Sequence, residues 1–370
     1  MSGSENHHFD FVLGTFEMSG LKSTQKSTVA NFVQKFIAFP ILLILFGLIC
    51  TNLFYVESVL EMSATLQSLS TYGHAVMRKI VILRCCNIWE ELHSDRGKFW
   101  RHDLFGKELG DGFRRKMLML KCLCLTLPIM TVFVAIYYSV GPIIYHEQDL
   151  PQPCWVPKPE YLPVIYFFQC LYMFELAFMD CFVDSTFLLM CGELEIQFLL
   201  LKKTIQSVRI GENCNNKKEE RCFQVLKGCT AFHFFLTDVH SKLNKGFSLF
   251  FFFQYLMTIE GICVQLYTIN MVDLTWDQML MAVIYIVAVL AQCCYGFLSA
   301  SNIEVEVDDF VNEIYEIDWY NARTSQIPKH ILFMMMNAQR LLYISGEGLF
   351  KVNRKTLLQV LVFFNKLELI

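Results

Sequence analysis

Three long runs without a charged residue constrain this chain more than any other feature. Residues 36–55, 122–140 and 278–303 are 20, 19 and 26 residues long. As helices, at about 1.5 Å per residue, such runs rise about 30 Å, the thickness of the hydrocarbon core of a bilayer. Only 18% of the 370 residues are charged, whereas a soluble domain has about a quarter. We therefore predict an all-α membrane protein.

Four further segments bring the predicted spans to seven: 60–83, 161–190, 246–272 and 356–370. The first of them is rich in Ser and Thr, so we expect it to face other helices or a cavity rather than lipid. The last is only 15 residues long. The stretch 331–344 contains Arg340 and is predicted to be a cytosolic amphipathic helix instead of a span.

Basic residues indicate the orientation of the spans. They gather in the segments that would be cytoplasmic with the N-terminus inside, which are 1–34, 84–116, 191–245 and 304–355. Only Lys158 and Lys366 fall in exterior segments. Because Lys and Arg are in excess on the cytoplasmic side, we predict a cytoplasmic N-terminus and an extracellular C-terminus. A G-protein-coupled receptor has the opposite topology.

This topology divides the chain unequally. Residues 1–355 hold six spans and a cytosolic anchor region at about 191–245 and 304–355, where the later spans continue as helical extensions. Residues 356–370 form the short final span. The first 31 residues are polar, so no cleavable signal peptide is expected.

Cysteines and histidines do not form a recognisable chemical site. Most of the 15 cysteines lie in apolar runs or predicted cytoplasmic loops, and only Cys154 lies in the sizeable exterior loop, so we expect mostly reduced, buried thiols. His233 and His240 are seven residues apart and could share a helix face, but further metal ligands at matching spacing are missing. We therefore expect no enzyme activity, no metal, no cofactor and no nucleic-acid partner.

Carboxylates inside the spans are costly in hydrocarbon and need an explanation. Asp180 and Asp184 lie one helical turn apart in span four, which also contains Glu175. Glu260 lies midway along span five, and its role stays open between structure and function. The acidic run 304–309 either attracts cations or, as we favour, forms a solvated helix face.

Several stretches between Met62 and Thr356 resemble the insect odorant receptor family in their order and spacing. The fourth span ends in Asp184-Ser185-Thr186-Phe187, and the helix before span five contains Phe232-His233. The most diagnostic stretches follow span six: Cys294-Tyr295-Gly296, Ile314-Tyr315-Glu316, Asp318-Trp319-Tyr320, Asn337-Ala338-Gln339-Arg340 and Gly346-Glu347-Gly348-Leu349-Phe350. The likeness at Asp184 implies a partner between helices.

The resemblance implies an odorant-binding subunit of a ligand-gated, non-selective cation channel. Such a subunit binds a small volatile odorant or pheromone and joins an olfactory co-receptor in a heterotetramer, in the plasma membrane of a sensory neuron dendrite. A gustatory-receptor-like channel and a metabotropic chemoreceptor or transporter are the alternatives.

The resemblance also implies a ligand pocket in the outer halves of spans two, three, four and six. Volatile ligands need a concave, mainly apolar lining with few polar groups. The residues in these halves that fit are Leu66, Leu69 and Tyr72; Val134, Tyr137 and Tyr138; Phe167, Cys170 and Phe174; and Met281 and Tyr285.

The resemblance places the pore on the final span of each subunit. Helical periodicity from Thr356 predicts an inward stripe of Val360, Phe363 or Phe364, and Leu367. Here 362–366 replaces a Ser/Tyr-rich stretch of the family, and 15 residues of helix rise only about 22 Å. We expect this chain alone to form no conducting pore.

Overall fold

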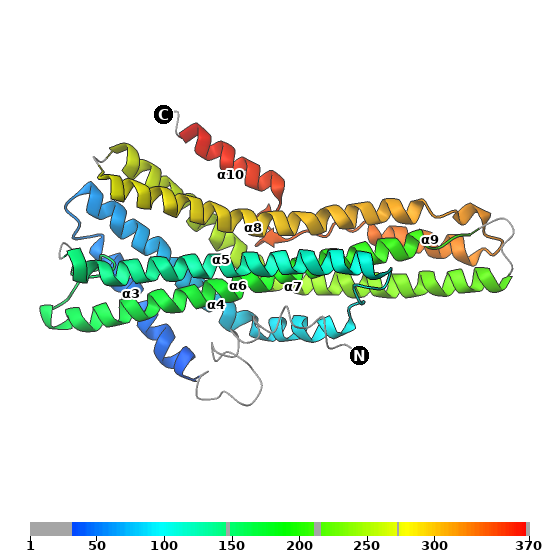
Figure 1. Ribbon diagram of the computed structural model, residues 1–370, viewed down its shortest axis with the longest axis horizontal. Coiled ribbons are helices and arrows are strands. Elements are labelled where there is room, and N and C mark those ends of the chain that lie inside the picture. Colours follow the sequence, from blue (N-terminus) through cyan, green and yellow to red (C-terminus); the bar gives the residue numbers. More distant parts are fainter. Residues whose placement is uncertain (1–31, 146–148, 211–215, 272–273, 368–370) are drawn as a thin grey trace.

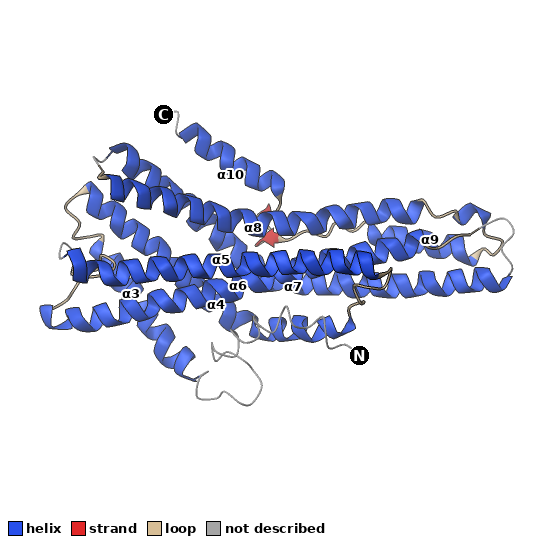
Figure 2. Cartoon of the chain, in the orientation of Figure 1, coloured by secondary structure: helices blue, strands red, loops and turns tan. Residues whose placement is uncertain are grey.

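The computed structural model describes residues 32–145, 149–210, 216–271 and 274–367, except for a few side chains within these ranges. Within them the fold is a long bundle of helices (Figures 1 and 2). The helices are α3 (Phe39–Asn52), which continues the π-helix η1 (Gln34–Ala38), α4 (Val59–Asp95), α5 (Lys107–Tyr145), α6 (Leu162–Gln206), α7 (Asn216–Met271), α8 (Trp276–Tyr315), α9 (Gln326–Ala338) and α10 (Arg354–Leu367). Short 3-10 turns at 96–98, 159–161 and 319–321 lie between them.

Each predicted span falls largely within one helix, and most of these helices run well beyond it. α4, α6, α7 and α8 continue into segments that the basic residues predict to be cytoplasmic. We call this end of the bundle, beyond the predicted spans, the inner part. Within the described residues, four helical stretches could cross a membrane by length and composition: Lys35–Asn52, Lys107–Ile144, Lys217–Asn270 and Gln278–Asn321. The Ser- and Thr-rich α4 and the acidic α6 are not among these stretches, and α10, with 14 residues, is too short.

Local sequence signals explain where the helices begin. The Ser58 hydroxyl accepts a hydrogen bond from the Glu61 backbone amide at 3.2 Å and caps α4. Thr275 and Gln278 form a capping box at the start of α8. Before α10, the Asn353 side chain accepts from the Thr356 amide at 3.1 Å. The polar residues between the apolar runs therefore determine where these helices begin.

The largest apolar core lies where α4, α5, α6, α7, α8 and α9 pack together, and it extends from the inner ends of the predicted spans through the inner part. Trp89 of α4 packs its ring against Phe182 and Phe247, with centroids 5.1 and 5.4 Å away. Leu236 of α7 and Phe310 of α8 are buried in the same core. Burial of these side chains stabilises the helices outside the bilayer, by about 2 kcal/mol for each large apolar residue.

The predicted amphipathic helix at 331–344 is shifted in the structure, where α9 covers Gln326–Ala338. Ile327, Ile331 and Met334 are its buried face. Beyond it the chain instead forms a two-stranded antiparallel sheet, β1 (Ser345–Gly346) and β2 (Phe350–Lys351). Gly348 in the connecting turn has a φ of 71°, a left-handed conformation that glycine adopts without strain. The helix therefore ends at Ala338, before the end of the predicted segment.

The segment between α5 and α6 folds inward at the outer end. The Gln169 side chain of α6 accepts from the Gln152 amide at 3.0 Å and donates to the Gln152 carbonyl at 3.1 Å. Gln169 also lies 3.2 Å from the Cys154 sulfur, and the Trp155 amide donates to the Leu48 carbonyl of α3. Every cysteine whose side chain the structure describes is a free thiol, and Cys154 is buried.

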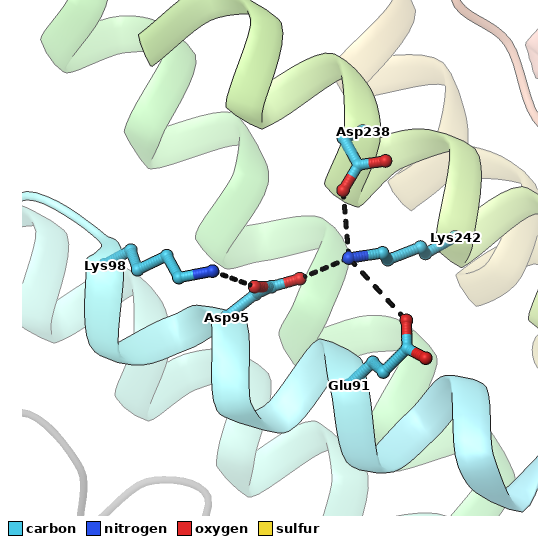
Figure 3. Close-up of polar contacts among 5 residues, drawn as sticks. All are labelled: Glu91, Asp95, Lys98, Asp238 and Lys242. Carbon is cyan, nitrogen blue, oxygen red and sulfur yellow. Dashed lines mark hydrogen bonds and ion pairs between the residues drawn. The ribbon is translucent and has the colours of Figure 1, made fainter. Parts of the chain in front are cut away.

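A charge network ties α4 to α7 in the inner part (Figure 3). Lys242 donates to Asp95 at 2.7 Å and to Asp238 at 2.9 Å, and it lies 3.7 Å from Glu91. Lys98 lies 2.7 Å from the other oxygen of Asp95. Burial alone would raise the pKa of Asp95, but the hydrogen bonds from the two lysines outweigh it and lower that pKa. The same contacts hold the pKa of Lys242 well above its ordinary value.

Candidate functional site

A polar cluster lies among α4, α5, α7 and α8 in their predicted membrane portions. The Ser70 hydroxyl of α4 lies against the Glu260 carboxyl of α7 and the Tyr285 hydroxyl of α8. Tyr138 of α5 lies beside Tyr285 and beside Gln67 of α4. We call these five residues the outer polar cluster. Four helices that are distant in sequence thus bring their polar groups to one place.

A glycine allows the close approach of α8 to α7 in this cluster. A Cβ atom added at Gly261 would lie 2.7 Å from the Tyr285 hydroxyl oxygen, which is closer than real contacts allow. The absence of a side chain at Gly261 therefore lets Tyr285 reach the level of Glu260.

Two atoms of the outer polar cluster have no hydrogen-bond partner among the described residues. They are the hydroxyl oxygen of Ser70 and the Oε2 atom of Glu260, and both are buried. Leaving such atoms unpaired away from water costs about 1–3 kcal/mol each, and more for a charged group. A ligand that supplied the missing partner would recover that cost.

An apolar cavity of about 230 Å³ opens between the outer ends of α4 and α7. Val59, Met62, Ser63 and Leu66 of α4 and Cys263, Val264 and Tyr267 of α7 line it. Val59 and Met62, at the outer end, are more than 40% exposed. Ser70 follows Leu66 by one helical turn, and Glu260 precedes Val264 by one turn. The inner end of the cavity therefore points at the outer polar cluster.

Buried ion pairs join α4 to α6 further inward. A guanidinium nitrogen of Arg78 lies 3.4 Å from Oδ2 of Asp184, which also accepts from Gln292 of α8 at 2.7 Å. Lys79 pairs with Glu175 of α6. The expectation that Asp184 is a partner between helices is confirmed, while the side chain of Asp180 lies outside the described residues.

The acidic run after span six is also engaged by cations. Glu306 of α8 pairs with Lys202 of α6 at 2.5 Å, and Glu304 lies 3.7 Å from Lys351 of β2. Asp308 is exposed. The run is therefore partly a helix-to-helix contact, where the sequence favoured a solvated face.

The residues predicted to bind ligand do not form one group. Tyr138 and Tyr285 belong to the outer polar cluster, and Leu66 lines the cavity. Tyr72 lies close to Cys170 in an apolar cluster between α3, α4 and α6, against which Leu69 packs. The exposed members are Val134, Tyr137 and Phe167, and the half-buried ones include Phe174 and Met281.

The residues predicted to line a pore are only partly described. Val360 and Phe364 are buried against Ile262 of α7 and Val289 of α8. The side chains of Phe363 and Leu367 lie outside the described residues. Leu358, Leu361 and Val362 are exposed apolar side chains of α10, which runs at an angle to α8 (Figure 1).

Some residues of the site were not singled out from the sequence. The Ser- and Thr-rich composition of span two does not distinguish Ser70 from its neighbours, and Cys263 and Val264 resemble any other apolar residues of a span. Glu260 was the exception, because a carboxylate in an apolar run is conspicuous. A signal for Ser70 would have been its spacing of one turn from Leu66 on the same face.

Comparison with known proteins identifies the class to which this fold belongs. The chain is similar to the solved insect olfactory receptor OR5 from Machilis hrabei, with a TM-score of 0.77 and 11% identity over 98% of this chain and 97% of that one. It is equally similar to the structure of that receptor in complex with eugenol, with a TM-score of 0.76, 11% identity and the same coverage. The chain therefore has a seven-helix membrane fold, as the sequence predicted.

The sequence itself supplies the family. The family model described as 7tm Odorant receptor matches residues 58–364. This chain belongs to the 7tm odorant receptor family. None of the curated proteins matches it.

Proposed function

We propose that this chain is the odorant-binding subunit of a ligand-gated, non-selective cation channel. The observation that carries the proposal is the apolar cavity between α4 and α7, which points at a buried cluster with unpaired polar atoms. Ligand sites are typically concave and mainly apolar, with a few polar groups that orient the ligand. A volume of about 230 Å³ suits a small volatile molecule.

Three residues of the predicted pocket lie in this proposed site: Leu66 lines the cavity, and Tyr138 and Tyr285 are in the outer polar cluster. Tyr138 and Tyr285 each supply an aromatic ring and a hydroxyl, which suits a ligand with one polar group on an apolar body. The olfactory receptor OR5 from Machilis hrabei, which has a similar fold, has been solved in complex with eugenol. This likeness supports a small odorant as the ligand here.

Tyr285 also links the site to the last helix. It packs against the apolar cluster in which α10 buries Val360 and Phe364. A ligand that binds more tightly to one arrangement of Tyr285 would favour the matching arrangement of α10. We propose α10 as the helix that lines the pore. Assembly with an olfactory co-receptor in a heterotetramer, in the plasma membrane of a sensory neuron, is proposed from the family resemblance.

Co-expression with an olfactory co-receptor tests this function. An odorant panel should evoke cation currents from the pair and none from this chain alone. Currents should persist when G-protein signalling is blocked with a non-hydrolysable GDP analogue, which distinguishes the channel from a metabotropic receptor. A robust odorant-evoked current from this chain by itself would contradict the proposed dependence on a co-receptor.

A substitution tests the site. Tyr285→Ala should shift the half-maximal concentration of the odorants found in the panel by tenfold or more, with surface expression unchanged. Tyr315→Ala, at an exposed position in the inner part of α8, is the control and should leave potency unchanged. Equal potency for Tyr285→Ala across all agonists would remove Tyr285 from the ligand site.

A further inference from the structure

We propose that Glu260 makes this receptor selective for odorants that carry a basic amine. The inference rests on the proposed function, because it names the ligand class of the same site. It begins from the contrast between Glu260 and two other carboxylates within the predicted spans.

Glu175 and Asp184 each have a cation from α4 beside them, Lys79 and Arg78 respectively. Both cations are almost fully buried. The ion pairs that the described residues form do not include Glu260. Its neighbour is instead the Ser70 hydroxyl, and its Oε2 atom has no hydrogen-bond partner within the described part of the chain. Glu260 is therefore a half-buried carboxyl group, with one oxygen fully buried, and the described residues supply no counter-charge for it.

The missing counter-charge defines the chemistry of a partner. A charged side chain without compensation is costly at membrane depth, and intramembrane carboxylates mark ligand or ion sites for that reason. An ammonium group brings one positive charge and two or three N–H donors, so it can satisfy both Glu260 and the unpaired Ser70 oxygen. An alcohol of the same size brings a single donor and no charge. Charge-assisted hydrogen bonds are roughly twice as strong as neutral ones.

The surroundings of Glu260 favour the same ligand. Tyr138 and Tyr285 belong to the same cluster, and the faces of aromatic rings attract ammonium groups. Ser70 is only 1% exposed, so bulk water competes little for these contacts. Toward the outside, the cavity walls are apolar and include Leu66 and Val264. The ligand that fits is thus an amine at the inner end with a short alkyl or phenyl tail in the cavity.

The test compares amines with neutral molecules of matched shape on the receptor co-expressed with a co-receptor. The probes are 2-phenylethylamine, 2-phenylethanol and propylbenzene, together with hexylamine and 1-hexanol. We expect each amine to activate at a concentration at least tenfold lower than its matched alcohol. N-acetylation of 2-phenylethylamine, which removes the charge, should abolish that advantage. Equal or higher potency of the alcohols would overturn the inference.

Variants assign the preference to Glu260. Glu260→Gln keeps the shape of the side chain but removes the charge, so it should lower amine potency tenfold or more, change alcohol potency much less, and thereby abolish the preference for the amine. Glu57→Gln, at an exposed position near the outer end, is the matched control and should change neither. Glu260→Asp keeps the charge and should keep the amine preference. Surface biotinylation reports whether each variant reaches the membrane.

The outcomes separate this inference from the proposed function. Currents evoked by other odorants, with no amine more potent than its alcohol, would overturn the amine selectivity and leave the odorant-gated channel standing. An amine preference that survives in Glu260→Gln would likewise remove Glu260 from the site. A complex that reaches the surface and responds to no volatile of any class would overturn both.

Discussion

Arg78 and Asp184 approach each other to 3.4 Å in the middle of the bundle, and both side chains are largely buried. The Arg78 guanidinium also lies over the ring of Phe250, 5.3 Å from its centroid, while Gln292 donates to the same carboxylate oxygen of Asp184. One ion pair thus connects α4, α6, α7 and α8. Because α4, α7 and α8 also carry the outer polar cluster, the pair helps to fix how the site is assembled.

Removal of the cation should destabilise the fold. Arg78→Met leaves the Asp184 carboxylate without its guanidinium partner, which typically costs about 3–5 kcal/mol in a buried pair. We expect a clear fall in the thermal unfolding temperature of the detergent-solubilised protein. Arg84→Met, at an exposed position on the same helix, should change it little. Equal unfolding temperatures for the two variants would show that the ion pair contributes no net stability.

The Lys242 network should stabilise the inner part. Lys242→Met removes the ammonium that faces Asp95, Asp238 and Glu91. Asp95 retains its contact with Lys98, so the expected loss is moderate, about 2 kcal/mol for the charged hydrogen bonds. Chemical or thermal denaturation measures it, with Lys245→Met at an exposed position as the control. A loss no larger than that of the control would show that solvent screening cancels the network.

Two buried histidines should make the inner part sensitive to acid. Burial lowers the pKa values of His233 and His240 from about 6.5 in an unfolded chain to about 4. Between these values the unfolded chain binds more protons, so stability is fully present above about pH 6.5 and falls as the pH drops toward 4. At pH 5 each histidine should cost on the order of 2 kcal/mol.

The histidine prediction is checked by comparing unfolding at pH 7 and pH 5. The double variant His233→Gln and His240→Gln should lose less stability over that interval than the unsubstituted protein. His93→Gln, at an exposed position on α4, should keep the full loss. If the double variant keeps it as well, other groups cause the acid sensitivity.

Gln169 should hold the outer segment in place. Gln169→Leu leaves the buried amide and carbonyl of Gln152 without partners, each at a cost of about 1–3 kcal/mol. We expect the segment to open more often. Cys154, which is buried in the unsubstituted protein, should then react faster with a membrane-impermeant maleimide. Cys154→Ser identifies the labelled site, and the exposed Gln359→Leu is the control. An unchanged labelling rate would mean that Trp155 and its neighbours hold the segment without Gln169.

The sequence was sufficient to locate the spans, because the length and apolar content of a segment can be read directly from its residues. It also indicated that the polar face of span two would be buried, as Ser63, Thr65 and Ser68 are. The inner ends of α4, α6, α7 and α8 were expected only as helical extensions, because the apolar core that stabilises them also includes residues of α5, α9 and α10.

The composition of the site was harder to predict because it depends on how each helix is rotated. Ser70 and Tyr72 are two residues apart, and two residues turn a helix by about 200°. Hence Tyr72 faces Cys170 while Ser70 faces Glu260. Periodicity correctly placed Val360 and Phe364 on one face of α10. It could not reveal that this face packs on α7 and α8 within the chain, and the pore-lining role stays a prediction.

α7 is one uninterrupted helix of 56 residues, from Asn216 to Met271, and is about 84 Å long. Glu260 near one end and His233 toward the other are about 40 Å apart along it. A tilt of only about 3° at the level of Glu260 would displace His233 by about 2 Å. A displacement of that size is more than a close-packed core can absorb without repacking. Because α7 is one continuous helix, a small tilt at the level of Glu260 can therefore produce a larger displacement in the inner part, with no relay of individual side chains.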